Sequence, residues 1–240
     1  MRLGVQPFTV RDIDEPLADK VRRIAAAGYE AVELSPDDAD DPAVRDALEE
    51  TGLAVSSLGV GEEDLEDPDR LAEAAETLGC EYVVLMYLGE DRWASESAAR
   101  ETAAFLDDAA ADLAERGLTF CYHNHAHEFV DLGDTTAYEQ VVADTDRVQF
   151  ELDLGWVGTG GLDPVALLSR LGDRVPLVHV KDMDFAAGEF VTFGEGDLDV
   201  AAALAEARDR GVEYALFEND QPEDPVAELS HARVVISGHL

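Results

Sequence analysis

Four segments of the chain each carry two imidazole, carboxylate or ammonium side chains that are two residues apart. The pairs are His123 with His125, Glu151 with Asp153, His179 with Lys181, and Glu218 with Asp220. Residues two apart in a β-strand point to the same face, so each pair would present its polar groups on one side of a strand. Buried carboxylates and imidazoles that face one another need a compensating charge, which a divalent cation supplies. The pattern therefore predicts a metal site.

The expected ligands are Asp153, His179 and Glu218, with His123 as the fourth ligand and His125 as its substitute. Two imidazoles and two carboxylates suit Mn²⁺, Zn²⁺, Co²⁺ or Fe²⁺ better than Ca²⁺. We expect one divalent metal per chain, with Mn²⁺ preferred and Mg²⁺ as a further alternative. Lys181 is one of only two lysines in the chain. Because lysine offers a compact positive charge, we interpret Lys181 as a group that holds a substrate oxyanion or phosphate.

Other polar and aromatic residues carry weaker signals. Glu33 ends a further predicted strand and is either part of the same site or an ordinary carboxylate at its rim. The rings of Phe8 and Trp156 could contact the face of a bound sugar, but packing in the hydrophobic core is at least as good an explanation for these two residues. A single histidine at the end of a strand is usually a hydrogen-bonded structural residue, and this is our interpretation of His127 and His231.

Short apolar runs alternate with amphipathic segments along the whole chain. The predicted strands are residues 2–6, 31–34, 54–58, 82–88, 119–125, 149–154, 177–181 and 214–218. The predicted helices are residues 16–27, 42–51, 68–78, 95–116, 136–143, 164–171, 198–210 and 225–236, and several begin at Asp-Pro. Eight strands alternating with eight helices predict a single (β/α)₈ TIM barrel over residues 1–240, with its site at the carboxyl ends of the strands.

Two further features bear on this fold. An open doubly wound sheet is the alternative, but the segment Gln6-Pro7-Phe8-Thr9 lacks the glycine-rich phosphate turn that it would need after the first strand. The glycines of residues 194–197 predict a flexible turn after the seventh strand.

The charge of the chain limits its partners. The 240 residues contain 54 Asp and Glu but only 17 Lys and Arg, for a formal net charge of −37. This charge repels phosphate backbones and argues against nucleic acid, and it is typical of proteins from a salt-loving cytoplasm. No apolar run approaches the ~20 residues of a membrane span, and Cys80 and Cys121 form no Cys-x-x-Cys pair. We therefore expect a soluble cytoplasmic protein without a membrane partner, and leave a homo-oligomer open.

The polar segments resemble a known family. The motifs are Tyr-His-Asn-His-x-x-Glu-Phe at residues 122–129, Glu-Leu-Asp-x-x-Trp-Val at 151–157, His-Val-Lys-Asp-Met at 179–183, Gly-Glu-Gly at 194–196 and Phe-Glu-Asn-Asp at 217–220. Together they resemble the sugar phosphate isomerase/epimerase group of xylose isomerase-like TIM barrels. The resemblance implies a small-molecule carbohydrate substrate and one divalent metal, held at the positions of His123, Asp153, His179 and Glu218. It also shows two departures, because ketose 3-epimerases have a glutamate at the position of His123 and often a histidine at that of Trp156.

The expected reaction is proton transfer next to a carbonyl through a metal-bound enediolate, giving isomerisation or epimerisation of a sugar, sugar phosphate or polyol. Glu218 is the expected base, Lys181 would steady a substrate oxygen, and His123, His125 or Glu128 could return the proton. If a β-hydroxyl leaves instead, the reaction is a dehydration of the inosose dehydratase type. A non-catalytic sugar-binding barrel is the alternative outside enzymes. The charge and the single ligand set argue against an endonuclease IV-like repair enzyme.

Overall fold

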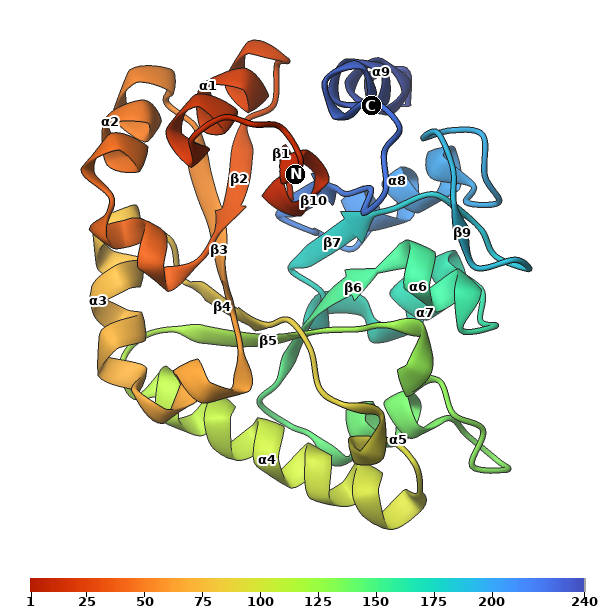
Figure 1. Cartoon of the computed structure of the whole chain (residues 1–240). Coiled ribbons are helices and arrows are strands. Elements are labelled where there is room, and N and C mark those ends of the chain that lie inside the picture. The colour runs from red at the N-terminus through yellow and green to blue at the C-terminus, as the bar shows by residue number, and fades with distance from the viewer. Residues whose placement is uncertain (240) are drawn as a thin grey trace.

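In the computed structural model, which describes residues 1–239, eight parallel strands close into a barrel surrounded by helices (Figure 1). Neighbouring strands follow the order β1-β10-β7-β6-β5-β4-β3-β2, and β1 pairs with both β10 and β2 to close the barrel. The strands are β1 (Arg2–Val5), β2 (Ala31–Leu34), β3 (Ala54–Val60), β4 (Tyr82–Leu85), β5 (Thr119–His123), β6 (Gln149–Asp153), β7 (Leu177–Val180) and β10 (Tyr214–Phe217). The predicted TIM barrel is confirmed.

At least one helix follows each barrel strand, as the alternating pattern predicts. They are α1 (Leu17–Ala26), α2 (Pro42–Thr51), α3 (Pro68–Leu78), α4 (Glu96–Ala114), α5 (Ala137–Asp144), α6 (Leu154–Thr159), α7 (Pro164–Leu171), α8 (Val200–Asp209) and α9 (Pro225–Ser237). The carboxylates of Asp41, Asp67 and Asp163 each accept a backbone N–H of the helix that follows, which confirms the expected caps. No helix within residues 1–239 combines the length and the apolar character needed to cross a membrane.

The structure corrects several expected boundaries. The strands β4 and β5 end at Leu85 and His123, earlier than expected, and β3 continues to Val60. Helix α6 was not expected: Asp153 ends β6 and accepts the backbone N–H of Trp156, which starts this short helix. Its six residues are too few for an amphipathic period to be recognised. A two-stranded antiparallel hairpin, β8 (Met183–Asp184) with β9 (Glu189–Phe190), also follows β7 unpredicted.

The alternation along the later strands decides which side chains face the barrel interior. Leu152 on β6, Leu154 directly after it, and Val178 and Val180 on β7 are all buried in the main hydrophobic core. The polar residues between them therefore point inward, as predicted. The strand register then places His123 beside Glu151 on the neighbouring strand and Asp153 beside His179. The polar residues of separate segments are in this way brought to one end of the barrel.

Candidate functional site

Four buried side chains converge at the carboxyl ends of β5, β6, β7 and β10. His123, Asp153, His179 and Glu218 each offer one ligand atom, and these atoms all lie within 4.8 Å of one another. Nδ1 of His179 is 2.8 Å from Oε2 of Glu218 and 4.0 Å from Oδ2 of Asp153. Nε2 of His123 is 3.8 Å from the same Asp153 oxygen. We call these four residues the ligand cluster.

The donor set of the ligand cluster fits a divalent transition metal. Two imidazole nitrogens and two carboxylate oxygens meet in a site where each residue is at most 6% exposed. Oδ2 of Asp153 is buried, and its described contacts are all with groups that can carry positive charge, as expected of an atom suited to a cation. The backbone of Asp153 is fixed by Asn124, whose amide side chain bonds to both its N–H and its carbonyl oxygen.

His125 lies beside the ligand cluster without belonging to it. Its ring centroid is 5.1 Å from that of His123, and its side chain is 27% exposed. The reason is that β5 ends at His123, and His125 precedes a 3₁₀ turn over Ala126–Glu128. The geometry therefore favours His123 over His125 as the strand-five ligand. Burial, and after it the charge of Lys181, lowers the pKa of His125 to about 3, so its imidazole is neutral at neutral pH.

Lys181 supplies the positive charge of the site. Its Nζ is 3.0 Å from Oδ2 of Asp153, 2.9 Å from Oε2 of Glu218 and 3.1 Å from Oδ1 of Asp220. Burial alone would lower the pKa of Lys181, but these three carboxylates raise it above its usual value. Burial alone would raise the pKa of Glu218, but Lys181 and His179 hold it well below its usual range. Glu218 is therefore an ionised carboxylate that can accept a proton.

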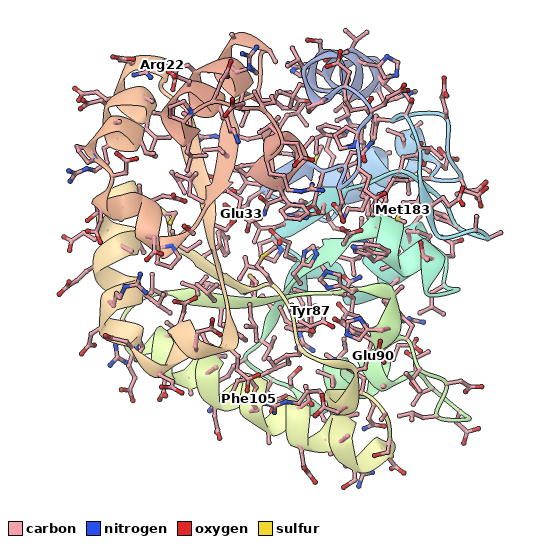
Figure 2. All side chains as sticks on the ribbon, viewed as in Figure 1. Arg22, Glu33, Tyr87, Glu90, Phe105 and Met183 are labelled. Atoms are coloured by element: carbon pink, nitrogen blue, oxygen red, sulfur yellow. The ribbon has the colours of Figure 1, made fainter. Side chains whose placement is uncertain are left out.

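Two more carboxylates lie deeper in the barrel. Glu33, labelled in Figure 2, is 1% exposed and belongs to the interior rather than to the rim. Its carboxylate accepts hydrogen bonds from Gln6 and Ser57 and lies 3.3 Å from Nε2 of His179. Glu151 is fully buried beside both histidines of the ligand cluster, and burial, then the charge of Glu33, raises its pKa to about 7.

A cavity of about 310 Å³ opens above the ligand cluster. Phe8 and Tyr87 stand at its opening, 48% and 53% exposed. Sequence reasoning missed Tyr87, which it placed inside a strand, and it assigned no role to Gln6 or Met86, which carry no strong chemical signal. The lining residues are Gln6, Phe8, Met86, Tyr87, His123, His125, Lys181, Glu218 and Asp220.

Glu128 and Trp156 do not line this cavity but contact residues that do. Glu128 is fully buried and accepts a 2.6 Å hydrogen bond from the hydroxyl of Tyr122, and its carboxylate lies 3.8 Å from Nδ1 of His125. Burial raises the pKa of Glu128 well above its usual value. The Trp156 ring lies 4.8 Å from Nζ of Lys181 and 5.8 Å from the ring of His125. Glu128 therefore contacts His125, and Trp156 contacts both His125 and Lys181.

The remaining sequence expectations concern structural contacts. His127 and His231 contact the carbonyl oxygens of Leu88 and Phe193, each at 2.9 Å, which agrees with their structural interpretation. The prediction of a flexible turn at residues 194–197 is wrong, because the backbone of this turn is held by hydrogen bonds. The carboxylate of Asp182 accepts the backbone N–H groups of Gly194, Gly196 and Leu198, and this fixes the turn beside β7.

Comparison with known proteins identifies the family. A family model for the xylose isomerase-like TIM barrel matches residues 21–233. The chain belongs to this family. An inosose dehydratase of Geobacillus kaustophilus (strain HTA426) is 29% identical to this xylose isomerase-like barrel, with 76% of this chain and 69% of that protein covered.

Solved structures share the whole fold. A sugar phosphate isomerase/epimerase from Parabacteroides distasonis ATCC 8503 superposes with a TM-score of 0.80 at 20% identity, covering 98% of this chain and 97% of that one. A probable 3-DHS dehydratase involved in petrobactin synthesis from Bacillus anthracis gives a TM-score of 0.79 at 16% identity, covering 99% of both chains. At these identities the likeness shows the fold, and the chemistry must be argued from the site.

Proposed function

We propose that this chain is a divalent-metal-dependent carbohydrate isomerase or epimerase that moves a proton next to a carbonyl. The observation that carries the proposal is the buried ligand cluster, in which two imidazoles and two carboxylates adjoin a cavity at the carboxyl ends of the strands. Catalytic residues of TIM barrels lie at this end. The names of the relatives, which include isomerases, epimerases and dehydratases, support an enzyme rather than a binding protein.

The roles of the residues follow from their positions. His123, Asp153, His179 and Glu218 would hold the metal, which when bound would polarise a carbonyl and acidify the adjacent C–H. Glu218 is the proposed base, because it is ionised and lines the cavity. His125 also lines the cavity, and the unprotonated ring nitrogen of its neutral imidazole would take the proton from Glu218 and return it to the substrate.

Lys181 is the proposed contact for a substrate oxygen. Its ammonium has three N–H donors and lines the cavity. All three donors face carboxylates, so a substrate oxygen would replace one of these contacts, most readily that of Asp220, which is the most exposed of the three carboxylates. Glu128 does not line the cavity, and we propose that it acts through His125 rather than on the substrate.

Dehydration is the second candidate. The 29% identical inosose dehydratase favours it, because the same proton abstraction by Glu218 leads to dehydration when a β-hydroxyl leaves. Both candidates share the first step, so both predict that deuterium from D₂O appears next to a carbonyl: in the isomerised or epimerised sugar in one case, and in the dehydration product, after its enol tautomerises, in the other. They differ in the product, which keeps the elements of water in one case and loses them in the other. A non-catalytic sugar-binding barrel would incorporate no deuterium.

Metal content is the first test of the proposed function. We expect wild-type protein purified in molar salt to contain about one equivalent of Mn, Co, Zn or Fe by mass spectrometry. The variant His179→Ala should lose this metal, because it removes one of the four ligands. His231→Ala is the matched control, since His231 contacts only the Phe193 carbonyl oxygen in the described hydrogen-bond network. A wild-type protein that stays metal-free after reconstitution would contradict the proposal.

The charge around the cavity predicts a preference for uncharged substrates. Among the described residues that line the cavity, Lys181 is the single Lys or Arg, and it already faces three carboxylates. A phosphate group would add about two negative charges near Glu218 and Asp220, and each close pair of like charges costs roughly 1–4 kcal/mol. We expect kcat/KM for an accepted sugar to exceed that for its phosphate ester by at least about tenfold. A preference for the ester, measured with the same metal, would contradict this.

A further inference from the structure

Glu151 contacts both histidines of the ligand cluster from below. Its Oε2 is hydrogen-bonded to Nδ1 of His123 at 3.1 Å, and the same oxygen lies 3.1 Å from Nε2 of His179. These are the ring nitrogens that face away from the cluster. The opposite nitrogens, Nε2 of His123 and Nδ1 of His179, are those that approach Asp153 and Glu218. One buried carboxylate oxygen therefore lies 3.1 Å from a ring nitrogen of each histidine, on the side of each ring that faces away from the cluster.

The fold explains how one side chain reaches both rings. Glu151 precedes Asp153 by two residues on β6, so it faces the same interior one layer deeper. The register places it directly beside His123 on β5, while Asp153 pairs with His179 on β7. Its exposed fraction is zero, so water cannot compete for its contacts. A charged carboxylate at this depth needs donors: Nδ1 of His123 is hydrogen-bonded to it, and Nε2 of His179 lies within 3.1 Å.

We infer that Glu151 is a positioning residue, which holds His123 with its proton on Nδ1 and His179 with its proton on Nε2. The two rings then present Nε2 and Nδ1, respectively, to the metal of the proposed function, on which this inference rests. A carboxylate that accepts the second N–H of a metal-binding histidine fixes its tautomer and orientation and increases its basicity. Here a single carboxylate is hydrogen-bonded to one histidine ligand and lies 3.1 Å from the ring nitrogen of the other, so its loss affects half of the ligand set.

A second metal held by Glu33, Glu151 and His179 is the competing interpretation of these contacts, since one atom from each lies within 4.8 Å of the others. The bonds of the two carboxylates argue against it. Glu33 already accepts hydrogen bonds from Gln6 and Ser57, and Glu151 accepts one from His123. His179 would also have to bind two metals through one ring. The hydrogen-bonding role uses the same atoms without these conflicts.

Metal affinity tests the inference directly, without any substrate. We expect Glu151→Gln to weaken Zn²⁺ and Co²⁺ binding about 10–100-fold in competition with a chromogenic chelator. Glu33→Gln is the matched control, because it neutralises a carboxylate of equal burial that approaches His179 at 3.3 Å but has Gln6 and Ser57 as its hydrogen-bond donors. Its loss of affinity should be clearly smaller. Glu151→Asp keeps the charge and should recover part of the affinity, and circular dichroism verifies that each variant is folded.

The histidine tautomers provide a second test, because they would not depend on Glu151 if this residue only packed in the core. In Zn²⁺-loaded wild-type protein, ¹⁵N NMR should find the proton of His123 on Nδ1 and that of His179 on Nε2, with through-bond correlation of each ring to its own backbone assigning the signals. Wild-type affinity in folded Glu151→Gln, or the same tautomer for both rings, would overturn the inference. Absence of metal binding by the wild type would overturn the inference and the proposed function together. If the wild type binds metal and Glu151→Gln weakens that binding, but the wild type turns over no carbohydrate, the proposed function alone would be overturned.

Discussion

Replacing Glu218 with Gln should lower kcat by about 10²–10⁴-fold, because the amide cannot accept the proton that the ionised carboxylate takes from the substrate. Glu218 lines the cavity, and Lys181 and His179 keep its pKa well below the usual range. The substitution preserves the size of the side chain, so the barrel should remain folded. The measurement is turnover of a proven substrate, together with the rate of deuterium uptake next to its carbonyl in D₂O.

Two controls separate the loss of the base from other effects of Glu218→Gln. Metal content must be measured in the variant, because Glu218 also belongs to the ligand cluster, and turnover is compared per bound metal. Glu228→Gln neutralises another buried carboxylate, which accepts bonds from Phe193 and Asn219 on the α9 side of the barrel. It should retain turnover within about twofold. Undiminished turnover and deuterium uptake in metal-loaded Glu218→Gln would exclude Glu218 as the base.

The sequence predicts the barrel and the convergence of the four residues of the ligand cluster because both depend on alternation. A parallel strand covered by helices buries one face under them and turns the other face inward, so Leu152 and Val180 reveal where Asp153 and His179 point. The helix starts are equally local, since the proline after Asp41 or Asp163 fits the first turn and the aspartate caps it. These signals need no knowledge of distant parts of the chain.

The depth of a residue in the barrel could not be predicted in the same way. Alternation gives the same face to Glu151 and Asp153, but the stagger between neighbouring strands decides which one meets the cavity and which lies below it. The position of Glu33 under His179 depends on the same stagger. Tyr87 reaches the opening because β4 ends at Leu85, and no turn residue in the sequence marks that end. Tertiary geometry, rather than local pattern, settles these positions.

Lys181→Met should destabilise the metal-free protein by about 3–5 kcal/mol near pH 8, because it removes the ammonium that faces three carboxylates. Lys181 is 1% exposed, so water cannot replace that charge without opening the barrel. In a chain of this length the loss corresponds to a fall in Tm of roughly 6–20 °C. Chemical or thermal unfolding in molar salt measures it. Lys20→Met is the control, because the other lysine of the chain donates a single hydrogen bond to the Arg11 carbonyl oxygen and should cost about 1 kcal/mol.

The destabilisation by Lys181→Met should depend on pH with a definite sign. Burial already raises the pKa of Asp153 above its usual value and, together with the charge of Glu218, raises that of Asp220 to about 7, although Lys181 opposes both shifts. Without the ammonium these folded-state pKa values rise further above their unfolded values. Protonation then stabilises the folded variant at low pH, and this stability is lost as the pH rises through the folded-state pKa values. The loss of unfolding free energy relative to wild type should therefore be small near pH 5 and reach its full size near pH 8.

Added divalent metal should reduce this loss at pH 8 by supplying the missing charge. A loss no larger than that of Lys20→Met, or one that does not change with pH, would mean that the three carboxylates do not depend on Lys181.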